Sequence, residues 1–97
     1  MIREVAHVTV LPDHHADFER DLERAVAEIL PQAQGLISFT GVGWCVERPH
    51  VYLFTIDWET LEDHTVGFRE SDLFTQWREI MGVHFDGAPT VEHFSLN

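Results

Sequence analysis

Two side chains in the second half of the chain are suited to taking a proton from a small molecule and holding the resulting anion. His64 is the first, because imidazole titrates near neutral pH and its helical face would turn it inward. Arg78 carries the positive charge that would stabilise the anion. His7, on an earlier strand, is a second candidate base or donor. Proton abstraction of this kind also requires a dry, apolar cavity around the reacting atoms.

Aromatic side chains near these residues could bind a flat substrate. Trp58 and Phe54 lie four residues apart on one predicted strand, so both point to the same side. Each candidate also has a purely structural interpretation. An inward His64 could be a core histidine bonded to the backbone, and Trp58 could belong to the core. Arg78 could form a surface ion pair with Glu79. The residues alone leave both interpretations open.

Hydrophobic periodicity predicts the elements that would position these residues. Alternating apolar positions mark strands, and apolar spacings of three and four mark helices. The predicted order is a strand at 2–11, a helix at 14–30, strands at 35–47 and 50–58, helices at 61–68 and 72–81, and a strand at 83–96 interrupted by a turn at 86–89. Asp13 is expected to cap the first helix, and Thr60 and Asp63 form a capping-box pattern before the second.

The strand at 35–47 has a further pattern. Simple alternation would place Thr40, Val42 and Trp44 on one face and Phe39 on the other. The closely spaced glycines in this strand suggest a β-bulge or a close approach by another backbone.

This element order predicts one α+β domain over residues 1–97 with a ferredoxin-like arrangement, a four-stranded antiparallel sheet with helices on one face. Helices on one face leave the other face of the sheet open. Because the two middle strands of the sequence are apolar on both sides, a second copy of the sheet is the expected cover. We therefore expect a homodimer formed through the open sheet face.

Composition excludes several classes of partner. The chain has 17 acidic residues against 6 arginines, a formal net charge of −11, so neither nucleic acid nor membrane is expected as a partner. Cys45 is the single cysteine, and the histidines show no zinc or iron ligand spacing, so no metal site is expected. No apolar run is long enough to span a bilayer, and the N-terminal residues lack a signal-peptide layout. These features predict a cytoplasmic protein.

Several segments together are similar to one known family. They are Phe18, Pro31, Gly35 and Phe39, then Val46–Pro49, Trp58–His64 and Phe68–Phe74. In combination they resemble the antibiotic biosynthesis monooxygenase family over about residues 2–96. The resemblance implies a dimeric α+β barrel, in which two ferredoxin-like protomers face each other through their sheets. It also implies a pocket between each sheet and its short helices.

The resemblance bears on the site through two branches of the family. The branch that oxidises anthrone-type polyketides without a cofactor has a Trp on the third strand and an Arg on the helices, which fall on Trp58 and Arg78. Its Asn and Tyr fall on Phe54 and His64. The retained pair favours an aromatic-binding pocket, and the lost Asn removes a hydrogen-bond donor to the substrate.

The remaining expected pocket residues are also aromatic. A His that some members carry on the second strand falls on Trp44, and Phe68 and Phe74 complete the expected substrate-binding set. The haem-degrading branch has an Asn, a Trp and a His at the places of His7, Phe68 and Arg78. All three differ, so haem degradation is not expected.

Two functional hypotheses follow. The first is a cofactor-independent monooxygenase that oxidises an aromatic polyketide-, anthrone- or quinol-type small molecule, with molecular oxygen as co-substrate. The second is a non-catalytic dimeric barrel that binds a hydrophobic small molecule. Family membership alone does not decide between them.

Overall fold

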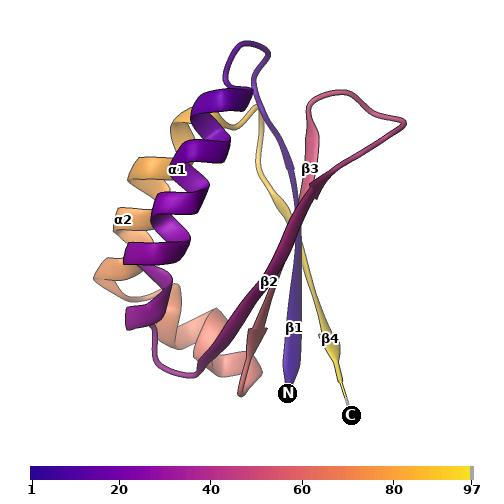
Figure 1. The fold of residues 1–97 in the computed structure, drawn as a ribbon. Helices are drawn as coiled ribbons and strands as arrows, with labels where there is room; N and C mark the ends of the chain where they lie inside the picture. Colours follow the sequence, from indigo (N-terminus) through magenta and orange to yellow (C-terminus); the bar gives the residue numbers. More distant parts are fainter. Residues whose placement is uncertain (97) are drawn as a thin grey trace.

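A computed structural model describes residues 1–96 and shows a sheet with helices packed on one of its faces (Figure 1). In chain order the elements are β1 (Ile2–Thr9), α1 (His15–Glu28), the 3-10 turn η1 (Leu30–Gln32), β2 (Leu36–Trp44), β3 (Val51–Trp58), the π-helical segment η2 (Asp63–Phe68), α2 (Asp72–Met81), the 3-10 turn η3 (Gly82–His84) and β4 (Thr90–Ser95).

The four strands form one sheet in the order β2-β3-β1-β4, and every neighbouring pair is antiparallel. Sequence neighbours β2 and β3 form a hairpin, whereas β1 lies between β3 and β4. This is the ferredoxin-like arrangement, so the predicted fold class is confirmed. Figure 1 shows both long helices on the same side of the sheet.

The core lies between the helices and the sheet face that they cover. Ala6 and Val8 of β1 point to this face, as do Phe54 and Ile56 of β3, and all four are buried. From α1 the buried side chains are Phe18, Leu22 and Ala25, whose spacing of three and four forms one helical stripe. Burial of this stripe fixes α1 across the sheet.

The faces of β2 differ from simple alternation. The pairing of β2 with β3 shifts register between Leu36 and Ser38 and again between Phe39 and Gly41. Each bulge adds one unpaired residue and reverses the side to which later side chains point. Phe39 therefore lies on the helix-covered face opposite Ile56, where its ring is 6.1 Å from that of Phe54. The predicted opposition of Phe39 and Trp44 is wrong, whereas the predicted bulge is confirmed.

Three predicted boundaries are also wrong. Asp13 has φ of 44° and does not cap α1; His14 is the N-cap residue and makes no side-chain cap hydrogen bond. Cys45 follows β2 and is half-buried, with its sulfur accepting a bond from the Arg48 backbone N–H at 3.3 Å. The part of the last predicted strand before its turn is wrong, because Gly82–His84 form a 3-10 turn and Phe85 makes only an isolated bridge with Val10. The strand that follows the turn begins at Thr90, as predicted.

The predicted capping box before η2 is confirmed. The backbone N–H of Thr60 donates to Asp63 Oδ2 at 3.2 Å, and the N–H of Asp63 donates to Thr60 Oγ1 at 3.1 Å. Gly35, just before β2, packs against this box and has φ of 81°. The box thus ties the start of η2 to the start of β2.

The second face of the sheet carries no helix among the described elements (Figure 1). His7 and Leu53, which pair across β1 and β3, point to this open face. Leu53 and Phe94 are exposed there. Arg3 and Asp57 form an ion pair on the same face, with Nε and Oδ1 2.8 Å apart. An apolar sheet face with one charged pair remains uncovered in the single chain.

Candidate functional site

A cavity of about 540 Å³ lies between the covered sheet face and the second-half helices. This volume is in the range of small-molecule sites, roughly 300–1,000 Å³. Its lining is mostly apolar, with four ionisable side chains among it. The lining residues are Glu4, Ala6, Val8, Leu30, Phe54, Ile56, His64, Phe68, Arg69, Phe74, Trp77, Arg78, Gly82, Phe85, Gly87, Ala88, Pro89 and Val91.

Glu4 is the buried carboxylate of the cavity. It alternates with Ala6 and Val8 on β1, so its side chain points among the apolar residues, and it is only 6% exposed. Trp58 Nε1–H donates to Glu4 Oε1 at 3.0 Å. Among the described residues, Oε2 has no hydrogen-bond partner. One oxygen is therefore held in place and the other is free to accept a proton from a ligand.

His64 lies beside Glu4 on η2. Its Nε2 is 3.3 Å from Glu4 Oε1, and its Nδ1 is 2.7 Å from His93 Nε2 of β4. The imidazole stacks on Trp58 with ring centroids 5.1 Å apart. The π-helical turn that carries His64 is a rare geometry that often occurs at functional sites. Glu4, His64 and His93 form a continuous polar chain from the cavity to the half-buried His93.

Burial sets the protonation states of this chain. Burial raises the pKa of Glu4 to about 7, although the Trp58 hydrogen bond and the positive charge of Arg69 both lower it. Burial, together with the charges of Arg69 and His93, lowers the pKa of His64 to about 3. Burial and Arg69 also lower the pKa of His93. At neutral pH the His64–Glu4 contact therefore joins a neutral imidazole to a half-ionised carboxyl, not two opposite charges.

This arrangement is suited to proton transfer. A carboxyl with a pKa near the working pH can both take and release a proton efficiently. A neutral imidazole between Glu4 and His93 can accept a proton at one nitrogen and release another at the other. The site can therefore take a proton from a ligand in the cavity and pass it towards the surface.

Comparison with known sequences identifies the family of the chain that forms this cavity. The sequence model described as "Antibiotic biosynthesis monooxygenase" matches residues 1–80. The chain belongs to the antibiotic biosynthesis monooxygenase family. The predicted resemblance is thereby confirmed.

Individual relatives agree with this assignment. The uncharacterized protein YczJ of Bacillus subtilis (strain 168) is 38% identical over 94 residues, covering 97% of each chain. The crystal structure of a candidate antibiotic biosynthesis monooxygenase from Bordetella bronchiseptica is 33% identical, covers 99% of this chain and 96% of that one, and has a TM-score of 0.92. A Caulobacter crescentus protein of the same description is 21% identical, with a TM-score of 0.81 and coverage of 99% and 89%, and shows the same fold.

Five of the eight site residues predicted from the sequence line the cavity. They are His64, Arg78, Phe54, Phe68 and Phe74. Phe54 lies on the sheet side, and the other four come from the helices. The rings of Phe68 and Phe74 are 5.6 Å apart in an edge-to-face contact, and Arg78 lies 5.9 Å from the centre of the Phe74 ring. The structure thus brings together residues from β3, η2 and α2.

Three predicted site residues lie outside the cavity. Trp58 is fully buried behind its wall, where it supports Glu4 and His64 and has no exposed surface for stacking on a ligand. Trp44 is 69% exposed at the hairpin end of β2, against Tyr52. His7 points to the open sheet face, because odd-numbered residues of β1 lie opposite Glu4 and Ala6. His7 therefore lies on the opposite face of the sheet from His64, and the structure does not bring the two histidines into one site.

Four lining or adjacent residues were missed by sequence reasoning: Glu4, Arg69, Trp77 and His93. Glu4 could have been found from the sequence, because it is an acidic residue at one of the alternating positions of β1 that face the core, with Ala6 and Val8. Trp77 belongs to the predicted apolar stripe of α2. The contact of His64 with His93 spans 29 residues and has no local signal.

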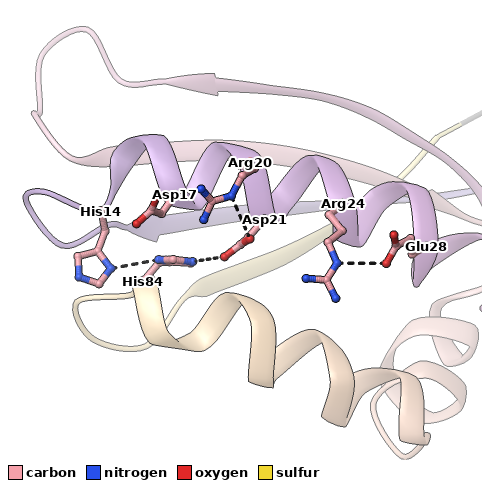
Figure 2. A network of polar contacts seen from close by, with 7 residues as sticks. All are labelled: His14, Asp17, Arg20, Asp21, Arg24, Glu28 and His84. Atoms are coloured by element: carbon pink, nitrogen blue, oxygen red, sulfur yellow. Dashed lines mark hydrogen bonds and ion pairs between the residues drawn. The ribbon is translucent and has the colours of Figure 1, made fainter.

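A second polar network lies away from the cavity, where α1 meets η3 (Figure 2). His84 contacts His14 Nδ1 at 3.1 Å and Asp21 Oδ2 at 2.8 Å. The hydrogen bond from His84 lowers the pKa of Asp21. The neighbouring His15 contacts His50 instead, so adjacent His14 and His15 point to different partners. These contacts fasten the start of α1 to the rest of the fold.

No group of three or more His, Cys, Asp or Glu side chains within residues 1–96 is arranged to hold a metal ion. Across the same residues, every helix is too short or too polar to cross a membrane.

Proposed function

We propose that the protein is a cofactor-independent monooxygenase that oxidises an aromatic hydroxy- or quinol-type small molecule. The observation that carries this proposal is Glu4, a carboxylate with a raised pKa inside an apolar cavity of an antibiotic biosynthesis monooxygenase family member. Direct reaction with oxygen needs a substrate anion, and Glu4 is placed to generate one. The neutral His64, the residue first predicted as base, supports Glu4 in this role.

The steps can be written for an anthrone-type methylene. Glu4 Oε2 takes a proton from the substrate, and the resulting anion is delocalised over the aromatic rings of the substrate. The anion transfers electrons to oxygen and forms a carbon–oxygen bond, giving a hydroperoxide after protonation. Loss of water leaves a carbonyl, so one oxygen atom enters the product and the other leaves as water. The substrate supplies all four electrons, and no external reductant is needed.

Aromatic walls suit this substrate class. Phe54, Phe68, Phe74 and Trp77 line the cavity, and the rings of Phe54 and Trp77 are 6.0 Å apart in an edge-to-face contact. Such walls bind flat rings and exclude water, which protects a reactive anion from side reactions. The lining therefore supports an aromatic substrate over a polar one.

The test is oxygen consumption with anthrones, naphthoquinols and catechol-type quinols. We expect at least one class to consume oxygen with the purified protein, without added metal, flavin or haem. The product should gain one labelled atom from ¹⁸O₂. Tight binding of these compounds without oxygen consumption would contradict the proposal and indicate a small-molecule binding protein instead.

We further propose a homodimer in which two open sheet faces cover each other. The exposed Leu53 and Phe94 on this face support it, since such apolar side chains gain stability when a second sheet covers them. Light scattering at micromolar concentration should give twice the chain mass of 11.2 kDa. A mass equal to one chain would overturn this assembly, and Leu53→Glu is the matching variant expected to shift the protein to monomers.

A further inference from the structure

Three of the six arginines of this acidic protein form no ion pair with a described residue, and two of these three line the cavity. The other three arginines are paired: Arg3 with Asp57, Arg20 with Asp17 and Asp21, and Arg24 with Glu28. Figure 2 shows Arg20 beside Asp21 and Arg24 beside Glu28 on α1. Arg69 and Arg78 make no ion pair with any described residue, although acidic residues outnumber arginines by 17 to 6. Their guanidinium groups remain available to an anion from outside the chain.

Arg69 and Arg78 lie at the entrance of the cavity. They line its inner wall, and with Phe74 and Gly82 they also line an open groove on the outside of the protein. Glu79 lines this groove too, so two guanidinium groups stand there against one carboxylate. Because Arg69 and Arg78 line both the cavity and the groove, they form the boundary between the inside of the cavity and the protein surface. A small molecule that enters from this groove therefore passes both guanidinium groups.

The positive charge at this entrance changes the pKa values of side chains inside the cavity. Arg69 lowers the pKa of Glu4, His64 and His93, so its charge acts on the whole proton-transfer chain. The remaining surface is strongly acidic and repels anions at long range. On such a surface, the two guanidinium groups of Arg69 and Arg78 form a local site that attracts an anionic group.

We propose that the cavity selects aromatic acids, with the carboxylate of the ligand held by Arg69 and Arg78 at the entrance and its ring placed between the aromatic walls. Guanidinium groups bind carboxylates through paired, charge-assisted hydrogen bonds. Anchored in this way, the far side of the ring points inward, towards Glu4. The inference deepens the proposed function by naming its substrate class, and it rests on that function only for the reaction at Glu4.

The test compares two probes of equal shape by calorimetry, 2-naphthoate and its neutral amide, 2-naphthamide. We expect naphthoate to bind about tenfold or more tightly than the amide, as charge-assisted hydrogen bonds of this kind imply. Arg69→Gln and Arg78→Gln should each weaken naphthoate binding and leave amide binding nearly unchanged. Arg48→Gln is the matched control, because Arg48 is exposed in the β2–β3 loop and does not line the cavity.

Equal affinity for the two probes in the wild-type protein would overturn the inference. So would a preference for naphthoate that survives in the Arg69→Gln/Arg78→Gln double variant. The outcome is separable from the proposed oxidation, because the probes report binding alone. An arginine-dependent preference without any oxygen consumption would uphold this inference while the monooxygenase proposal fails.

Discussion

Glu4→Gln is expected to lower the rate of oxygen consumption by about 10²–10⁴-fold, with whichever substrate the wild-type protein consumes. The amide keeps the shape of the side chain and an oxygen that can accept the Trp58 N–H, but it cannot take a proton. The loss should appear in kcat, because the cavity and its aromatic walls are unchanged. Oxygen-electrode rates at saturating substrate measure it.

The same substitution is expected to stabilise the fold at alkaline pH. The pKa of Glu4 is raised from 4.5 to about 7, so the folded state favours the protonated form. Its contribution to stability is complete below pH 4.5 and is lost as the pH rises through about 7. The glutamine side chain carries no such charge, so the free energy of unfolding of the variant should exceed that of the wild-type protein by about 3 kcal/mol at pH 8, and by little near pH 4.5. His64 titrates with the opposite sign, since the pKa of its imidazole is lowered.

Glu19→Gln is the matched control for both measurements. The Glu19 carboxylate accepts a hydrogen bond from the Tyr52 hydroxyl at 2.9 Å, but it does not line the cavity. We expect wild-type oxygen consumption in this variant. A Glu4→Gln protein that keeps the full rate, or that is less stable than wild type at pH 8, would refute the assignment of Glu4 as a buried base.

Gly35→Ala is expected to destabilise the protein by about 3 kcal/mol, through two separate effects. The φ of Gly35 is 81°, which an alanine adopts only with strain. An added Cβ would also overlap the carboxyl group of Asp63, which caps η2. Displacing Asp63 frees the start of the segment that carries His64, so ligand binding in the cavity should weaken as well. Thermal unfolding measures the first effect and calorimetry the second.

Gly87→Ala separates the two effects. Gly87 has a similar φ of 86°, but a Cβ there meets no atom within 4 Å. This control should therefore show only the backbone cost, roughly 1 kcal/mol. In Gly35→Ala/Asp63→Gly the overlap is removed, because the Asp63 Cβ would also lie 2.7 Å from the added Cβ, and the extra loss should largely disappear relative to Asp63→Gly alone. Equal destabilisation by Gly35→Ala and Gly87→Ala would show that contact with Asp63 has no energetic role.

Much of the fold could be predicted because each element has a local pattern. The stripe of Phe18 and Leu22 is visible in the sequence, and so is the capping box of Thr60 and Asp63. The faces of β2 could not be assigned, since two bulges reverse the alternation and their positions depend on the pairing with β3. Local pattern predicts elements well and register poorly.

The candidate site was only partly predictable for a related reason. His64 was found because an imidazole stands out on the apolar face of a short helix, and Arg78 because the family resemblance places an arginine there. Glu4 carried the clearest chemistry and was overlooked, because one acidic residue in a strand is ordinary until its face is known to be buried. Its partners Trp58 and His64 come from positions at least 54 residues away along the chain, and no spacing rule connects them.

The most direct test of Glu4 as the buried base of the cavity is its titration in the folded protein. Carbon-13 NMR of glutamate side-chain carboxyls, with Glu4→Gln used to assign the signal, gives the midpoint without any substrate. We expect a midpoint of about 7, displaced upward in Trp58→Phe because the hydrogen bond that lowers the Glu4 pKa is lost. A wild-type midpoint near 4.5, the ordinary value for glutamate, would contradict it.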